Sequence, residues 1–175
     1  MIKPGTMLIA HPNIEQGLFA KSVILITEHH RRGTVGFILN KPSELKLGQV
    51  LERHGIDWTT VPSELFTGGP LNQSALIMIH TGEWYSQNTM TFTKNLSISS
   101  DDIMMEKVSM GNFPNKFRFV SGLSAWMPGQ LDTEIKSQTW LTFEPNEDII
   151  FNYTGSAQWR KAVDVCASQH VAQFF

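Results

Sequence analysis

The chain has 175 residues, of which 41% are hydrophobic and 17% charged, and its formal net charge is −2. This length fits one domain, residues 1–175, that can bury enough surface to be stable without disulfides or structural metals. The single cysteine excludes an intramolecular disulfide and a cysteine-based zinc site. The near-neutral charge argues against a dedicated nucleic-acid binder, and no apolar run approaches the roughly 20 residues that cross a bilayer. No secretion signal is recognisable, so we expect a cytoplasmic protein without membrane contact.

Short apolar runs separated by turn residues predict strands in the first part of the chain. Residues 6–10 form one run, and residues 22–27 are almost wholly apolar, which is typical of a strand covered on both faces. A polar turn over residues 29–33 leads into a returning strand at 34–39, so the pair predicts a hairpin. Apolar residues at helical spacing predict a helix over 45–54.

The second part of the chain mixes further strands with helices. Helix-capping residues predict helices that begin near residues 101, 128 and 156. Residues 121–124 are expected to form a tight Gly/Ser turn, and residues 148–151 to extend a strand or start one. Residues 65–66 lead into an expected turn over residues 67–70. Strands are expected at 75–80, 90–93, 95–99, 116–120 and 140–143. About eight strands and four short helices in mixed order indicate an α+β or mixed α/β fold.

Several sequence motifs for catalysis are absent. The chain has no phosphate-binding P-loop, no dinucleotide fingerprint and no His-Glu-x-x-His zinc motif. Residues 122–126 come one glycine short of a nucleophile elbow, which leaves Ser124 a weak nucleophile candidate. The sequence therefore predicts no particular cofactor or reaction.

Histidines at strand ends raise a metal hypothesis. His29 follows one buried-type strand and His80 ends another, so the two could approach each other, with Glu28 as a carboxylate ligand. Hydrogen-bonded or solvated histidines at strand ends are far more common. We therefore expect no metal site.

Three turns carry the residues that look most like a ligand site. Residues 121–140 combine an expected helix start with an amide, a carboxylate and a flat aromatic wall, although acidic residues there oppose an anion. The glycines of a second turn permit close backbone approach, and an Asn-Lys pair in a third can bind a ligand or tie loops together. With the two histidines, the candidate ligand-binding residues are His29, Asn40, Lys41, Gly68, Gly69, His80, Trp126, Gly129, Gln130 and Glu134.

The order of these segments resembles the AlgH/YqgE family of bacterial proteins, whose biochemical function is not established. The matching blocks are residues 5–12 (GTMLIAHP), 33–42 (GTVGFILNKP), 68–70 (GGP), 129–135 (GQLDTEI), 140–141 (WL) and 159–162 (WRKA). The resemblance implies an α+β fold with a bent, bulged mixed sheet, partly barrel-like, flanked by about four short helices. This chain departs from the family where Ala125 and Met127 fill small positions, which implies a narrower, less polar pocket there. It also has residues 16–18 (QGL) in place of the family's usual Asp-Pro.

Three functions remain open from the sequence. The first is a non-enzymatic regulatory or binding protein that acts through an unknown small-molecule or protein partner. The second is an enzyme whose pocket is formed by His29, Asn40, His80 and Gln130, which requires these side chains to converge. The third is a transcriptional regulator, as members of the resembled family are often described. The residues do not favour direct DNA binding, because basic residues occur only as isolated pairs.

Overall fold

The computed structural model of the chain describes residues 1–58 and 64–172. Within these residues the strands form one nine-stranded sheet in the order β6-β7-β5-β8-β3-β2-β1-β9, with β4 beside β8. The strands are β1 (Met7–Ala10), β2 (Val23–His30), β3 (Gly33–Ile38), β4 (Phe66–Thr67), β5 (Leu71–Thr81), β6 (Met90–Thr91), β7 (Leu96–Ser99), β8 (Phe117–Trp126) and β9 (Trp140–Phe143). The helices are α1 (Leu47–Arg53), α2 (Asp102–Ser109), α3 (Gln130–Lys136), α4 (Glu147–Asn152) and α5 (Gly155–Ala172).

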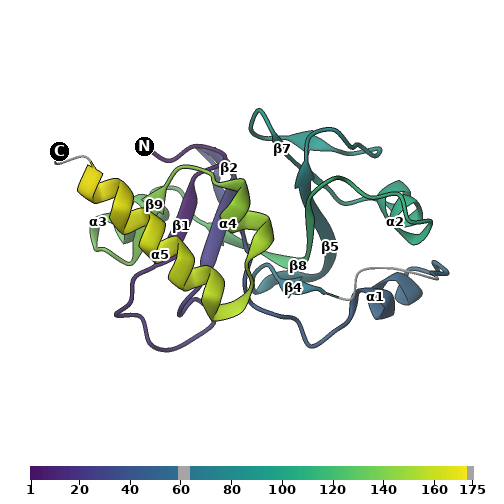
Figure 1. Cartoon of the computed structure of the whole chain (residues 1–175), viewed down its shortest axis with the longest axis horizontal. Helices are drawn as coiled ribbons and strands as arrows, with labels where there is room; N and C mark the ends of the chain where they lie inside the picture. Colours follow the sequence, from purple (N-terminus) through teal and green to yellow (C-terminus); the bar gives the residue numbers. More distant parts are fainter. Residues whose placement is uncertain (59–63, 173–175) are drawn as a thin grey trace.

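The predicted α+β class with a bent, partly barrel-like sheet is confirmed. The strand pairs are antiparallel except for β4 and β8, which run parallel, so the sheet is mixed as expected. The sheet curls into a half-barrel. Figure 1 shows β1, β2 and β9 at one end, behind α4 and α5, and β5 and β7 at the other end, nearer α1 and α2.

Strand β8 joins the two ends of the sheet, and it corrects one expectation. Its first half pairs with β5, whereas Ser124 to Trp126 pair with β3. The turn expected at residues 121–124 is absent because the strand bends there without stopping. Gly122 adopts a left-handed φ of 79°, and a Cβ at this position would lie 2.6 Å from the Gly69 carbonyl oxygen. Glycine therefore allows the strand to bend while its pairing moves from β5 to β3.

Alternating side chains along the first strands fill both faces of the sheet. Met7 and Ile9 of β1 belong to the core that α4 and α5 cover, whereas Leu8 and Ala10 belong to a second cluster. That second cluster also contains Trp126, Leu131 and Trp140, so β8, α3 and β9 close this face. A third cluster packs α1 and α2 against β5 and the start of β8. The continuous apolar run of β2 is buried on both faces, as predicted.

The helix prediction needs two corrections. The chain has five helices in the described residues, and α5 is not short but spans 18 residues. The segment expected to extend a strand near residues 148–151 is α4. Its N-cap is Asn146, whose side-chain oxygen accepts the backbone N–H of Ile149 at 3.1 Å. The apolar run there was too short for its period to separate helix from strand, and the cap decides the conformation.

Candidate functional site

A cleft beside α3 contains the candidate residues that converge best. We call it the tryptophan cleft, and its volume is about 330 Å³. One wall comes from the end of β8, α3 and the start of β9, and the other from the loop between β1 and β2. The lining residues are Ile14, Gln16, Gly17, Leu18, Phe19, Ala125, Trp126, Gln130, Glu134, Thr139 and Trp140.

Glu134 is the polar centre of the tryptophan cleft. Its Oε2 accepts the indole N–H of Trp126 at 3.0 Å and that of Trp140 at 2.7 Å. Its Oε1 accepts the side-chain amide of Gln130 at 3.0 Å. The amide oxygen of Gln130 in turn accepts the backbone N–H of Met127 at 3.0 Å. Four hydrogen bonds therefore fix the carboxylate and the amide before any ligand arrives.

Aromatic rings pack around the Glu134 carboxylate on the core side of the cleft. The ring of Trp140 stands nearly perpendicular to Trp126, with centroids 6.3 Å apart, and to Phe19, with centroids 5.8 Å apart. Trp126 is only 5% exposed and Trp140 only 3%, so both rings are packed into the core. Only their polar edges reach Glu134. The arrangement is rigid because ring packing and hydrogen bonding fix the same side chains.

The structure thus brings together Trp126, Gln130 and Glu134 of the predicted residues. Gly129 stands next to them as the residue before α3, in the left-handed conformation with φ of 78°. Ala125 lines the cleft, as the departure from the resembled family implied, whereas Met127 is exposed. Sequence reasoning did not select Trp140 and Phe19. Trp140 follows Glu134 by six residues in the sequence. Its indole N–H can reach the Glu134 carboxylate only because the turn after α3 brings the chain back toward the helix.

Asn40 and Lys41 tie segments together and do not face the tryptophan cleft. Asn40 is 1% exposed, and its Oδ1 accepts the backbone N–H of Val23 at 2.9 Å. Its Nδ2 donates to the carbonyls of Lys21 at 2.8 Å and Gly155 at 2.9 Å. The Lys41 ammonium donates to the Ala20 carbonyl in the loop between β1 and β2. Burial, followed by repulsion from Lys21, lowers the pKa of Lys41. The side-chain hydrogen bonds of Asn40 are thus used within the fold.

Gly68 and Gly69 allow close contact with β8. The Gly68 N–H donates to the Ser121 carbonyl at 2.7 Å, and the Gly68 carbonyl accepts the Ser124 hydroxyl at 3.1 Å. A Cβ at Gly68 would lie 2.3 Å from the Gly122 carbonyl oxygen, and one at Gly69 would lie 2.1 Å from that of Leu123. The close approach is therefore to the protein's own backbone. Ser124 is buried and its hydroxyl is used in this contact, which argues against a nucleophile.

The two candidate histidines make local hydrogen bonds. His80 is fully buried, with Nδ1 2.9 Å from the Thr81 carbonyl and Nε2 2.8 Å from the Ser99 hydroxyl. A neutral ring satisfies both groups, and burial lowers the pKa of His80 despite the opposing effects of the Thr81 carbonyl and Glu83. His29 places Nδ1 2.7 Å from the Thr34 hydroxyl.

The pocket of His29, Asn40, His80 and Gln130 does not form. His29 lies opposite Thr34 in the pairing of β2 with β3. Asn40 follows Thr34 by six residues, which in an extended chain corresponds to about 20 Å. His80 makes its hydrogen bonds to Thr81 and Ser99 on β5 and β7. Gln130 lines the tryptophan cleft, whereas His29, Asn40 and His80 are not among its lining residues, so the four side chains do not share this cavity. The described residues also contain no group of three or more His, Cys, Asp or Glu side chains able to hold a metal ion.

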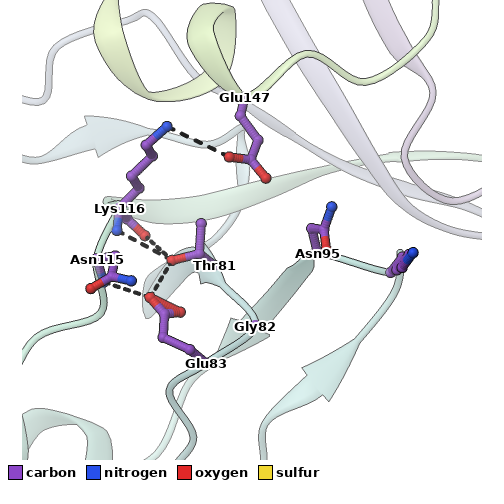
Figure 2. A pocket seen from close by; sticks show the side chains of 8 residues that line it. Thr81, Gly82, Glu83, Asn95, Asn115, Lys116 and Glu147 are labelled. Atoms are coloured by element: carbon purple, nitrogen blue, oxygen red, sulfur yellow. Dashed lines mark hydrogen bonds and ion pairs between the residues drawn. The ribbon is translucent and has the colours of Figure 1, made fainter.

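A second cleft, missed by sequence reasoning, lies where β5 and β8 meet the hairpin of β6 and β7. Its volume is about 340 Å³, and Figure 2 shows its polar side chains. The Glu83 carboxylate accepts the Thr81 hydroxyl at 2.6 Å and the Asn115 backbone N–H at 2.7 Å. Burial alone would raise the pKa of Glu83, but these hydrogen bonds lower it. Lys116 lies 3.6 Å from Glu147, so these two opposite charges of the cleft pair with each other.

No helix in residues 1–58 or 64–172 combines the length and apolar character that a membrane span needs.

Comparison with known proteins gives relatives over nearly the whole chain. Residues 7–170 match the family described as AlgH-like. A UPF0301 protein of Marinomonas sp. (strain MWYL1) is 31% identical over 161 residues, covering 90% of this chain and 86% of the relative. One of Polaromonas sp. is 32% identical over 166 residues, covering 89% of this chain and 84% of the relative.

Solved structures agree with this assignment. The solution structure of the AlgH protein from Pseudomonas aeruginosa has a TM-score of 0.79 at 26% identity, covering 94% of this chain and 88% of that one. The crystal structure of a protein from Corynebacterium diphtheriae has a TM-score of 0.74 at 27% identity, covering 93% and 86%. Sequence match and fold lead to one conclusion: the chain belongs to the AlgH-like family, whose UPF0301 members are uncharacterised.

Proposed function

We propose that this protein is a non-enzymatic binding protein with a regulatory role, and that a small molecule or a side chain of a protein partner occupies the tryptophan cleft. One observation carries the proposal. The Glu134 carboxylate is held in a cleft of about 330 Å³ by two indole N–H groups and the Gln130 amide. A polar group fixed among aromatic and aliphatic walls is the usual composition of a ligand pocket.

The residues around Glu134 favour binding over catalysis. Among the described residues that line the tryptophan cleft, Glu134 is the one ionisable side chain. The hydroxyl of the lining residue Thr139 lies 3.3 Å from that of Ser137, which donates to the Glu134 backbone carbonyl, so neither hydroxyl is paired with the Glu134 carboxylate. Nucleophilic and general acid–base catalysis need such a pair within hydrogen-bond reach. The four hydrogen bonds around Glu134 and Gln130 also lower the ordering cost of binding, because the side chains are already placed.

Two further parts of the proposal concern location and DNA. The single cysteine, Cys166, is buried and free, which fits a reducing compartment such as the cytoplasm. Any effect on transcription is proposed to be indirect, through the bound partner, because Arg31-Arg32 and Arg160-Lys161 are separate short pairs. A DNA-binding assay at low salt checks this point: salt-sensitive binding to duplex DNA would contradict it.

A thermal-shift screen tests the binding function. The purified protein is heated with metals, nucleotides, flavins and common metabolites, and a ligand of the native state raises Tm by mass action. Hits are repeated with Glu134→Gln and with Asp132→Asn, a matched change at an exposed carboxylate on the same helix. We expect the shift to shrink in Glu134→Gln only. The proposal would be refuted if the hits raised the Tm of both variants equally, or if the protein turned over an ester, phosphate or redox substrate.

A further inference from the structure

We infer that the tryptophan cleft takes an organic cation that carries N–H groups on a short aliphatic stem, an alkylammonium or an alkylguanidinium. This inference rests on the proposed binding function. Its basis is a carboxylate that has hydrogen-bond donors but no cation beside it.

The charge of the cleft is unbalanced. Of the described lining residues only Glu134 is ionisable, and no Lys, Arg or His of the described chain forms an ion pair with it. The groups around it are aromatic rings, aliphatic side chains, neutral amides and the Thr139 hydroxyl. In such surroundings a charge interacts more strongly with a ligand than it would in water. An anionic ligand is repelled, whereas a cation supplies the missing counter-charge.

The side-chain oxygens of Glu134 and Gln130 keep open acceptor positions in the cleft. A carboxylate has about four lone-pair positions, and three of those on Glu134 are used, which leaves one on Oε1. The amide oxygen of Gln130 accepts one N–H and has a second position open. Both indole N–H donors are already used by Glu134. The cleft therefore suits a ligand with at least two N–H donors, which a primary ammonium or a guanidinium has and a quaternary ammonium lacks.

The rest of the cleft suits a short apolar stem. Ile14, Leu18 and Phe19 line the wall opposite α3, and Leu18 is 38% exposed. The volume of about 330 Å³ equals that of about ten water molecules, enough for a cation of a few heavy atoms. A free amine and the Lys or Arg side chain of a partner protein share this chemistry.

Titration followed by the indole N–H signals of Trp126 and Trp140 in an NMR spectrum tests the inference. The probes are butylammonium, butylguanidinium, the neutral isostere butylurea and the anion butyrate. We expect the cations to shift the indole signals and to bind about tenfold tighter than butylurea or butyrate, since one charge-assisted hydrogen bond contributes roughly this factor. Glu134→Gln should weaken cation binding about tenfold, and Asp132→Asn should leave it unchanged.

Two additions keep the test decisive. Gln130→Ala alters an exposed residue, so it serves if Glu134→Gln fails to fold, and it should also weaken the cations. A capped Gly-Lys-Gly peptide compares the two sources. Binding as tight as butylammonium indicates a partner's side chain, and binding of free butylammonium alone indicates a small amine; either result supports the cation class.

The failures are distinguishable. Butylurea binding as tightly as the cations, with no effect of Glu134→Gln or Gln130→Ala, would overturn the cation inference and leave the binding function standing. The cation inference would also be overturned, and the binding function would still stand, if no cation shifted the indole signals but a hit from the thermal-shift screen did. If neither the cations nor any hit from the screen shifts the indole signals, both proposals fail.

Discussion

Replacing Asn40 by leucine tests the tie between the start of β2 and the start of α5. Leucine has nearly the same shape as asparagine but can neither accept nor donate hydrogen bonds. The change removes three of them: from the Val23 N–H, and to the carbonyls of Lys21 and Gly155. Because Asn40 is buried, water cannot replace all of these partners.

The magnitude follows from the separate groups. A buried N–H left without a partner costs about 1–3 kcal/mol, and each lost hydrogen bond to a carbonyl costs about 0.5–1 kcal/mol. We therefore expect Asn40→Leu to lower the free energy of unfolding by about 3 kcal/mol, a large share of the roughly 5–15 kcal/mol of an ordinary domain. With a urea m-value of about 2 kcal/mol/M, the midpoint of unfolding should fall by about 1.5 M.

Urea unfolding followed by tryptophan fluorescence is the assay, and Asn152→Leu is the matched control. Asn152 is exposed, and its side chain donates one hydrogen bond, to Asp148 at 2.7 Å. The control should change the free energy of unfolding by no more than about 0.5 kcal/mol. A loss in Asn40→Leu below about 1 kcal/mol, or one equal to the control, would refute the structural role assigned to Asn40.

Two further predictions follow from His80 and Gly69. Because the pKa of His80 is lowered on folding, the native state binds fewer protons than the unfolded chain, so unfolding free energy should fall as pH drops below about 6.5. His80→Gln should flatten the dependence of unfolding free energy on pH between pH 7 and pH 5, whereas His54→Gln, at an exposed position, should leave it unchanged. Equal slopes in the unmodified protein and both variants would be evidence against the effect of burial on His80. Gly69→Ala should cost about 2–3 kcal/mol, since its Cβ would lie 2.1 Å from the Leu123 carbonyl oxygen, while Gly82→Ala, with no atom closer than 3.8 Å, should be nearly neutral in the same urea assay.

Local sequence patterns predicted most strands because burial on one or both faces leaves a clear period. Strands β1, β2, β3 and β9 follow the apolar runs closely. The continuation of β8 through Gly122 was missed, since a glycine beside serines indicates a turn when read locally. What keeps the strand going is its pairing with β3, a contact that residue spacing cannot show. Helix α4 was missed for a similar reason, because its two buried isoleucines fit either period.

The candidate site was predicted in part. Trp126, Gln130 and Glu134 are close in sequence, so their convergence could be anticipated from the turn before α3. Asn40 has the polarity of a binding residue, and only its partners at Val23 and Gly155 show that it holds the fold together. Polar residues that bind ligands and polar residues that satisfy buried backbone groups have the same appearance in a sequence.

The pairing of β1 with β9 has a consequence for the order of folding during synthesis. Met7 lies opposite Phe143, so one edge of the first strand has no partner until the ribosome has released residues far beyond the middle of the chain. The hairpin of β2 and β3 can form early, because its contacts are local. The other edge of β1, however, stays open to wrong partners in a nascent or truncated chain. Chains that stop before β9 should therefore associate through β1, whereas chains that include β9 cover that edge themselves.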